Sequence, residues 1–340
     1  MTTNHNKRLL WQIPFLILLI VGTVLIIRQQ HTMPYQKCAG SVFGTTYHIT
    51  YQYDDDLQSE IVAKMQEVDN SLSMFNKESV ISRINNNQHP KLTSMFLEVF
   101  QQAQKISEDT EGAFDITVGP LVNAWGFGFK HEQLPDKHAV DSLMAIIGYQ
   151  KVRCNGNQII KSDPRIVLDC SAIAKGYGVD VIARLLSEKG ISNYMVEIGG
   201  EVVTRGISEK RVPWKIGVTK PTDDPLAEGN ELQTVLNVTD KAMATSGNYR
   251  NFYYKGKRKY AHTINPKTGY PVQHNILSAT VLTSTCMRAD AYATSFMVMG
   301  FEGARKVLER NPDLMAYIIY DDHGQNKVWY SPSLQDKIAK

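Results

Sequence analysis

The stretch from Leu168 to Glu201 carries residue types that bind phosphate groups. It is predicted to form a strand that ends at Asp169, a helix that begins near Ala172, and a second strand that ends at Gly199-Gly200. Lys175 is the fixed positive charge beside these strand ends and the helix start. Amides at a helix N-terminus, glycines that allow close approach and a lysine counter-charge together favour a bound phosphate. The spacing matches neither the P-loop nor the dinucleotide-binding fingerprint, and similar units without a site are common in α/β proteins.

Three further segments contain residue types that could take part in chemistry. Asp290 and Thr294 are four residues apart in a predicted helix and therefore point the same way. A carboxylate with a hydroxyl suits Mg²⁺ when a backbone carbonyl or a substrate phosphate completes the coordination shell. His262 precedes a turn at Asn265-Pro266, where a histidine serves either the structure or the chemistry. Residues 245–248 (TSGN) offer two hydroxyls and a flexible backbone, or form an ordinary turn.

The elements that must position these residues follow from hydrophobic periodicity. Alternation from Val42 to Tyr53 predicts a half-buried strand, and apolar residues every three or four positions predict helices. Asn155-Gly156 predicts a hairpin, and the polar segment 130–145 is expected to be exposed. The helices are predicted at 57–73, 93–108, 172–190 and 288–299, and further strands at 166–168, 193–198, 214–219, 232–238, 260–264, 277–283 and 314–320. Because many strands follow one another without an intervening helix, we expect one α+β domain with a mainly antiparallel sheet.

Composition sets limits on the function. The chain has 340 residues, 43% of them hydrophobic, and a net charge of +3 from 37 basic and 34 acidic residues that are well mixed. Such a chain can bury a substantial core and shows no nucleic-acid footprint. The four cysteines have no metal-binding spacing, and buried single thiols are expected, although their pairing cannot be deduced from the sequence.

The N-terminus contains an apolar segment of nearly the length that spans a bilayer. Ile13 to Ile27 carries no charge and follows Lys7 and Arg8. No Ala-x-Ala cleavage site follows it, which favours an uncleaved anchor over a signal peptide, and the residues before Cys38 do not suit lipidation. We therefore expect an anchor with a short linker at 1–37 and a domain at 38–340 outside the cytoplasm, on the periplasmic side of the inner membrane.

Five segments in order resemble the ApbE family of FAD:protein FMN transferases. They are LDCSAIAKGYGVD, GAFDITVGPLVNAWGFG, TSGNYRNFY, HTINPKTGYPV and RADAYATSFMVMG, and the resemblance covers about residues 41–332. It implies a single T-fold-related domain whose mainly antiparallel sheet is flanked by helices. It also implies an exported, Mg²⁺-dependent enzyme that transfers the FMN half of FAD to a threonine or serine hydroxyl of an acceptor protein and releases AMP. The acceptors that it suggests are subunits of membrane redox complexes.

The resemblance assigns roles to individual positions. Asp290 and Thr294 match the metal-binding side chains, with the carbonyl of Ala172 as a third ligand. Asp169, Lys175 and Ile264 match FAD contacts, as do the consecutive residues Ala113, Phe114 and Asp115. Phe75 matches an aromatic residue beside the flavin nucleotide, and Phe43 stands where the family usually has methionine. Cys170 and Asn265 also depart from the family pattern, and these departures concern nucleotide packing.

The proton acceptor is left with two candidates. Transfer through a pyrophosphate needs a divalent ion and an oriented hydroxyl. His262 is a candidate to accept the proton of that hydroxyl, and Asp169 is the alternative. Two other functions stay open, a metal-dependent FAD pyrophosphatase that uses water in place of the protein hydroxyl, and a flavin-binding carrier without turnover.

Overall fold

The protein is described here from a computed structural model, which covers residues 4–127, 134–221, 231–248, 252–255 and 258–339. The helices are α1 Asn4–Thr32, α2 Gln58–Leu72, α3 Val80–Asn85, α4 Ser94–Asp109, α5 Gly119–Ala124, α6 Lys137–Met144, α7 Ser171–Glu188 and α8 Cys286–Arg310, with short 3-10 helices η1 Tyr149–Lys151 and η2 Pro332–Lys337. The strands of the main sheet are β1 Tyr35–Val42, β2 Thr45–Gln52, β5 Tyr194–Ile198, β6 Glu201–Arg205, β9 Lys241–Gly247, β12 Ile276–Thr283, β13 Met315–Asp322 and β14 Gln325–Tyr330. Three two-stranded sheets are formed by β3 Val152–Asn155 with β4 Gln158–Lys161, β7 Trp214–Thr219 with β8 Leu232–Val238, and β10 Phe252–Lys255 with β11 Arg258–Ala261.

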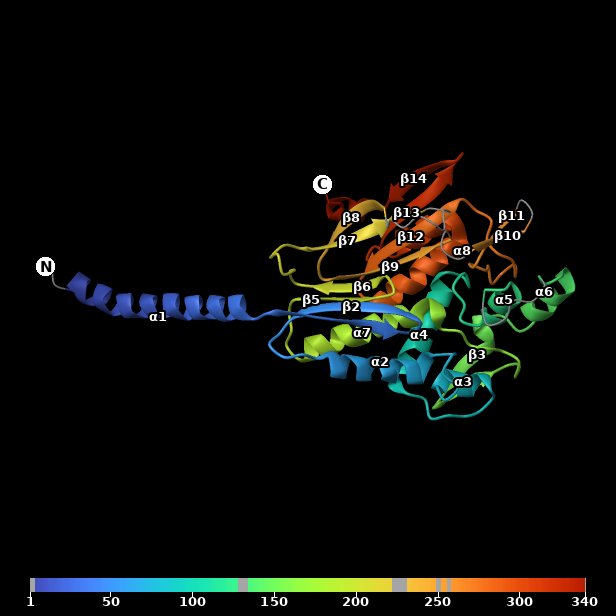
Figure 1. Ribbon diagram of the computed structural model, residues 1–340, viewed down its shortest axis with the longest axis horizontal. Coiled ribbons are helices and arrows are strands. Elements are labelled where there is room, and N and C mark those ends of the chain that lie inside the picture. The colour runs from blue at the N-terminus through green and yellow to red at the C-terminus, as the bar shows by residue number, and fades with distance from the viewer. Residues whose placement is uncertain (1–3, 128–133, 222–230, 249–251, 256–257, 340) are drawn as a thin grey trace.

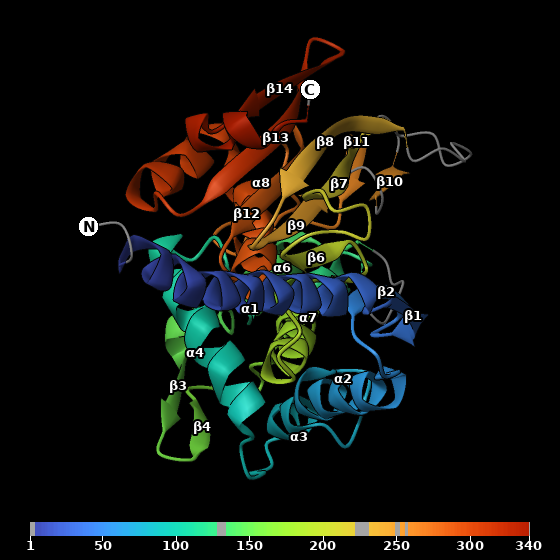
Figure 2. The same ribbon diagram turned by 90° about the vertical axis from the view of Figure 1, so that its left-hand side faces the viewer.

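The main sheet has the order β1-β2-β5-β6-β9-β12-β13-β14, and each pair of neighbours is antiparallel. Helices cover one face of it, and the β7–β8 hairpin covers the other (Figures 1 and 2). On the helical face, α7 packs on β5 and β6 while α8 packs on β9 and β12. On the opposite face, Val218 and Leu236 of the hairpin join a buried cluster with Met243 and Ile319 of the sheet. The prediction of an α+β domain with a mainly antiparallel sheet is confirmed.

Strand alternation and helical periodicity predicted most of these elements. Tyr47, Ile49 and Tyr51 of β2 are buried on one face, as the alternation requires. Their side chains join one core cluster with Ile61 of α2 and Ile182 of α7. α7 thus packs between the main sheet and α2, and this packing fixes where the polar residues of α7 lie.

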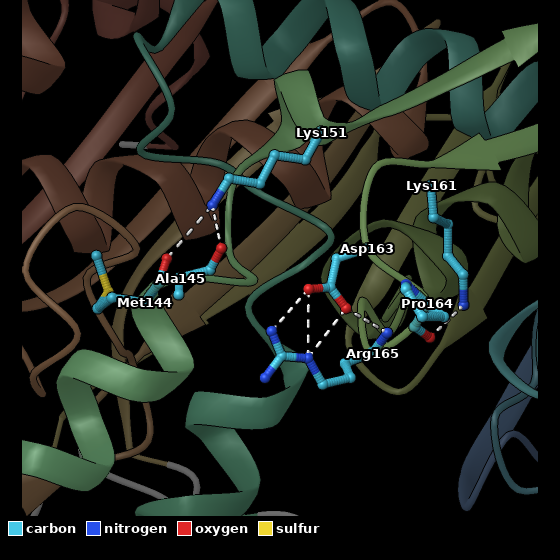
Figure 3. A network of polar contacts seen from close by, with 7 residues as sticks. All are labelled: Met144, Ala145, Lys151, Lys161, Asp163, Pro164 and Arg165. Atoms are coloured by element: carbon cyan, nitrogen blue, oxygen red, sulfur yellow. Dashed lines mark hydrogen bonds and ion pairs between the residues drawn. The ribbon is translucent and has the colours of Figure 1, made fainter.

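Residues 166–168 are the clearest exception, because they form an irregular segment and not the predicted strand. Ile166 and Leu168 are fully buried, which explains the apolar pattern. The backbone of Leu168 is hydrogen-bonded in both directions to the side-chain amide of Asn85, at 2.8 and 2.9 Å. Lys161 donates to the carbonyl of Pro164 (Figure 3). It also donates to the carbonyl of Ile166, so the segment that leads to the start of α7 is held by side chains.

Several boundaries also differ from the predictions. The 130–145 segment includes α6, whose Val140 is buried, so its described part is not simply an exposed stretch; residues 130–133 lie outside the described residues. The strand expected at 260–264 ends at Ala261. The helix expected at 288–299 begins at Cys286 and continues past a kink at Gly300, where φ is 75°. β1 begins at Tyr35, ahead of the expected domain start at residue 38.

The N-terminal helix α1 extends away from the rest of the molecule (Figure 1). Its apolar side chains are exposed, with 67% of Phe15 and 72% of Leu18 accessible. Over the residues that the structure describes, no helix combines the length and apolar character needed to cross a membrane. The anchor therefore stays a proposal.

Candidate active site

One cavity of about 580 Å³ brings most of the predicted site residues together. It lies between the start of α7, the first half of α8, the strands β6, β7 and β9, and the loops around residues 113–116 and 262–266. The predicted residues that line it are Ala113, Phe114, Asp115, Asp169, Ala172, Lys175, His262, Ile264, Asp290 and Thr294. Gly199, Gly200, Thr245 and Ser246, which the sequence also singled out, line the same cavity.

The crossing of α7 and α8 places Asp290 beside the start of α7. The N–H of Gly176 donates to Asp290 Oδ2 at 3.0 Å, and the Asp290 side chain is 4% exposed. In a regular helix the same N–H points at the carbonyl of Ala172, so the contact brings the Asp290 carboxylate next to that carbonyl. A Cβ atom on Gly176 would lie 2.3 Å from the carbonyl oxygen of Cys286, so this close approach requires glycine.

Ala172, Asp290 and Thr294 line the same cavity and would offer a metal ion only oxygen donors, from one backbone carbonyl and two side chains. Thr294 lies one turn after Asp290 on α8, and its hydroxyl is 3.0 Å from the hydroxyl of Ser246 on β9. No group of three or more His, Cys, Asp or Glu side chains in the described parts of the chain could hold a metal ion. One carboxylate, one hydroxyl and one carbonyl suit a hard divalent cation such as Mg²⁺, which keeps water or phosphate oxygens as its remaining ligands. The residues therefore fit the metal that the family resemblance implies.

Lys175 forms a buried ion pair that sequence reasoning did not predict. Its Nζ lies 2.6 Å from Glu201 Oε1 and 4.0 Å from Asp290 Oδ1. Burial lowers the pKa of Lys175, but the charges of Asp290 and Glu201 outweigh this and hold the pKa above its ordinary value. Burial raises the pKa of Glu201. Lys175 is thus a protonated cation at the cavity wall, with 32% of its side chain exposed.

Glu201 lines the cavity as the ion-pair partner of Lys175 and was not predicted from the sequence. It begins β6 directly after Gly199 and Gly200, which adopt left-handed backbone angles of φ 63° and 101°. Its Oε2 is buried without a hydrogen-bond partner among the described residues. The available signal was the Gly-Gly turn directly before it, because strand alternation gives none: Glu201 and its neighbour Val202 are both buried.

Asp169 sits where the irregular segment becomes α7. Its N–H donates to the carbonyl of Ile116 at 2.6 Å, and its Oδ1 accepts the N–H of Ser171 at 2.8 Å. A Cβ on Gly119 would lie 3.1 Å from Asp169 Cβ, so the first residue of α5 packs tightly against Asp169. Asp169 therefore lines the cavity from a fixed position.

Asp115 uses both carboxylate oxygens to hold its own loop. Oδ1 accepts the N–H and the hydroxyl of Thr117, at 2.8 and 2.7 Å, and Oδ2 accepts the N–H of Tyr149 at 2.8 Å. Burial raises the pKa of Asp115, although these hydrogen bonds oppose the shift. The loop that they stabilise presents Ala113 and Phe114 to the cavity.

His262 lines the cavity and follows the last residue of β11 in the chain. Its ring meets that of Phe127 edge-on, with 6.4 Å between centroids. The turn that follows is fixed by hydrogen bonds from Asn265 N to Tyr270 O and from the Trp125 indole to Gly269 O. His262 and Asp169 therefore share one cavity, as a proton acceptor and its alternative require.

Two predicted FAD contacts lie elsewhere. Phe43 is in the β1–β2 turn, at φ 52°, and its ring packs against Gly178 of α7. It joins the core because the turn folds its ring over α7. Phe75 is in the loop between α2 and α3 and is 78% exposed. Neither side chain lines the cavity, so the contact of these two residues with FAD stays a prediction from the family pattern.

Comparisons with known proteins agree on one family. The family model described as "ApbE family" matches residues 43–319. A protein of Vibrio cholerae named FAD:protein FMN transferase is 38% identical over 313 residues, which is 89% of this chain and 92% of that protein. A protein of the same name from Haemophilus influenzae is 36% identical and covers 84% of this chain and 87% of its own length. A solved structure, the flavin transferase ApbE from Vibrio cholerae, has a TM-score of 0.81 at 37% identity and covers 89% of this chain and all of that one.

Proposed function

Because the chain belongs to the ApbE family, we propose that it is an FAD:protein FMN transferase that moves FMN from FAD to an acceptor protein. The acceptor group is a threonine or serine hydroxyl, and the second product is AMP. The hydroxyl oxygen attacks the phosphorus of the FMN half, a new phosphoester bond forms, the pyrophosphate bond breaks, and the hydroxyl proton passes to a base. Atoms and charge balance without an oxidant or a reductant.

The observation that carries the proposal is the set of residues that line one cavity. It holds the donor set of Asp290, Thr294 and the Ala172 carbonyl together with Lys175 and His262. A divalent ion, when bound, neutralises negative charge on the pyrophosphate. A storage protein would not need this combination, since holding a flavin does not require a polarised pyrophosphate.

The chain's own residues bind and orient the nucleotide. Lys175 supplies a positive charge toward the phosphates. It lies near the start of α7, where the free amides of the helix also favour an anion. Gly199 and Gly200 line the cavity without side chains, so the phosphates can approach the backbone of these two residues closely. Phe114 and Ile264 add apolar surface for the ring systems of FAD.

His262 is the proposed proton acceptor. It lines the same cavity as the proposed metal ligands, and an imidazole is the side chain most often used as a general base. Asp169 is the second choice, because its Oδ1 already accepts the Ser171 N–H at the start of α7.

The proposed location is the outer side of the cytoplasmic membrane, with α1 as an anchor. The uncharged run from Ile13 to Ile27 and the exposed apolar side chains of α1 support it. A membrane-held catalytic domain fits an acceptor that is itself a subunit of a membrane redox complex.

Incubation of the protein with FAD, Mg²⁺ and a candidate acceptor tests the proposal. Covalent flavin on the acceptor is detected by in-gel fluorescence after denaturation, and AMP by chromatography. We expect both products in equal amounts. Equal amounts of free FMN and AMP, with no fluorescent acceptor, would identify a pyrophosphatase, and intact FAD would identify a carrier.

A further inference from the structure

Asp180 joins the two helices that carry the proposed metal ligands. It lies on α7, one turn after Gly176, and its carboxylate reaches the first residues of α8. Oδ1 accepts the N–H of Cys286 and Oδ2 accepts the N–H of Met287, both at 2.8 Å. The first N–H groups of a helix have no partner within it, so Asp180 caps α8 from another helix.

The residue that would usually cap α8 is not used for that purpose. Thr285 precedes α8 with extended backbone angles, φ −132° and ψ 145°, which suit an N-cap. Its side chain makes no cap hydrogen bond, and its buried Oγ1 has no hydrogen-bond partner within the described parts of the chain. A local cap would stabilise α8 wherever the helix lay, whereas the Asp180 cap forms only when α8 is docked on α7.

One turn away, a second hydrogen bond joins the two helices with donor and acceptor exchanged. At Asp180 the amides of α8 donate to a carboxylate of α7, and at Gly176 the amide of α7 donates to the Asp290 carboxylate of α8. The missing side chain of Gly176 brings the helices close enough for both contacts. Two contacts one turn apart determine how far the helices can slide or rotate against each other.

We propose that Asp180 is a positioning residue that sets the spacing of the metal ligands through the α7–α8 crossing. The inference rests on the proposed function, because it assumes that Asp290, Thr294 and the Ala172 carbonyl hold Mg²⁺. The carbonyl belongs to α7 and the two side chains belong to α8, so the distances among the three donors depend on how these helices pack. Asp180 lies outside the cavity lining and touches neither metal nor nucleotide.

Metal affinity, measured on the full-length chain, tests the role apart from turnover. Mg²⁺ binding is followed by isothermal titration calorimetry for the wild type, Asp180→Asn and Asp180→Ala, without FAD. We expect the Kd for Mg²⁺ to rise by about 10-fold to 100-fold, as is typical when a group that orients metal ligands is lost. The asparagine variant keeps the test decisive if the alanine variant folds poorly.

Tyr177→Phe is the matched control. Tyr177 is also on α7, but its hydroxyl donates to Glu98 Oε2 of α4 at 2.8 Å, away from α8. This variant loses one hydrogen bond of α7 and should lower the thermal midpoint without changing the Kd for Mg²⁺. An equal loss of affinity in Tyr177→Phe would show that general destabilisation explains the result.

Thr285→Asp in the Asp180→Ala background separates positioning from capping. The new carboxylate can cap α8 locally and restores the negative charge near it, but it does not connect the helix to α7. We expect the thermal midpoint to recover and the Kd for Mg²⁺ to stay high. Recovery of the Kd, or wild-type affinity in both Asp180 variants, would overturn the proposal. A wild-type protein that does not bind Mg²⁺ would instead overturn the metal site of the proposed function.

Discussion

Asp290 is the one carboxylate among the three proposed metal ligands, so Mg²⁺ binding should depend on it more than on Thr294 or Ala172. Asp290→Ala should abolish Mg²⁺-dependent transfer, and Thr294→Ala should have a milder effect because a water can replace a hydroxyl ligand. Steady-state transfer rates at several Mg²⁺ concentrations measure both. Undiminished Mg²⁺-dependent activity in Asp290→Ala would place the metal elsewhere.

His262→Ala should lower the rate of transfer by about 10² to 10⁴ with little change in FAD affinity, because a general base acts on the acceptor hydroxyl and not on the bound nucleotide. Single-turnover transfer, FAD binding and the thermal midpoint are measured together. A histidine that only supports the turn at Asn265 would instead lower the midpoint and impair binding and rate alike. Near-normal transfer would leave Asp169 as the base.

Lys175→Ala serves as the contrast to His262→Ala. Lys175 supplies charge to the ground-state nucleotide, so FAD affinity and transfer rate should fall together. The same change leaves the Glu201 carboxylate buried without its partner at 2.6 Å, so the thermal midpoint should also fall. Lys175→Ala with Glu201→Gln should recover part of that stability and none of the FAD affinity.

The sequence identified the polar residues of the site better than the apolar ones. Asp169, Lys175, Asp290 and Thr294 could be singled out because charge and spacing limit what they can do, and all four line the cavity. Glu201 was missed because its role depends on Lys175, twenty-six positions away in the chain. Phe43 and Phe75 lie outside the cavity lining, and the sequence alone could not place them because an aromatic ring suits a core, a loop or a ligand equally well.

At the scale of elements, the close contact of α7 with α8 depends on Gly176. Gly176→Ala should cost about 1–3 kcal/mol in the free energy of unfolding, since the added methyl group meets the Cys286 carbonyl at 2.3 Å and the backbone must move. Gly178→Ala is the matched control on the same helix. Its methyl group meets the ring edge of Phe43 at 2.6 Å, and a side chain can turn aside. Urea unfolding that shows an equal or smaller cost for Gly176→Ala would contradict the tight crossing.

The Asp180 cap predicts a pH dependence of stability. Burial raises the pKa of Asp180 from 3.8 to about 6, although the N–H groups of Met287 and Cys286 oppose the shift. The folded state therefore holds a proton that the unfolded state has lost, and this group's contribution to the free energy of unfolding falls as pH rises from about 4 to about 6. Asp180→Asn lacks this dependence. The stability advantage of the wild type over Asp180→Asn should be smaller at about pH 7 than at about pH 4, and equal values by urea unfolding at both would contradict the raised pKa.

The long helices α2, α4, α7 and α8 and the strands with clean alternation were predictable, whereas the shorter helices α3 and α6 and the irregular segments were not. β7 and β8 were predicted to the residue. β7 alternates in burial along its length, and in β8 the buried Leu236 and Val238 alternate with a partly buried residue. α3 was missed, since six residues give less than two turns of periodicity and its start depends on a cap from Ser79. Residues 166–168 carry the apolar pattern of a strand, but their hydrogen-bond partner is the Asn85 side chain, which no local pattern reveals.

At the scale of the whole molecule, the proposed anchor makes a separate prediction. The full-length chain should sediment with membranes and be released by detergent, whereas a chain that begins at residue 34, just before β1, should stay in solution and retain transferase activity. Cell fractionation with an antibody to the C-terminal part measures both. Recovery of the full-length chain in the soluble cytoplasmic fraction would contradict the anchor.

If this cavity moves FMN from FAD onto a protein hydroxyl, the product is visible by intact-mass spectrometry of the acceptor. The acceptor is incubated with FAD, Mg²⁺ and the wild type, with the Asp290→Ala variant and an acceptor whose threonine or serine is replaced by alanine as controls. With the wild type and the unaltered acceptor, the acceptor mass should increase by one FMN minus one water, and neither control should show this increase. An unchanged acceptor mass with the wild type, while FAD is consumed to FMN and AMP, would contradict it.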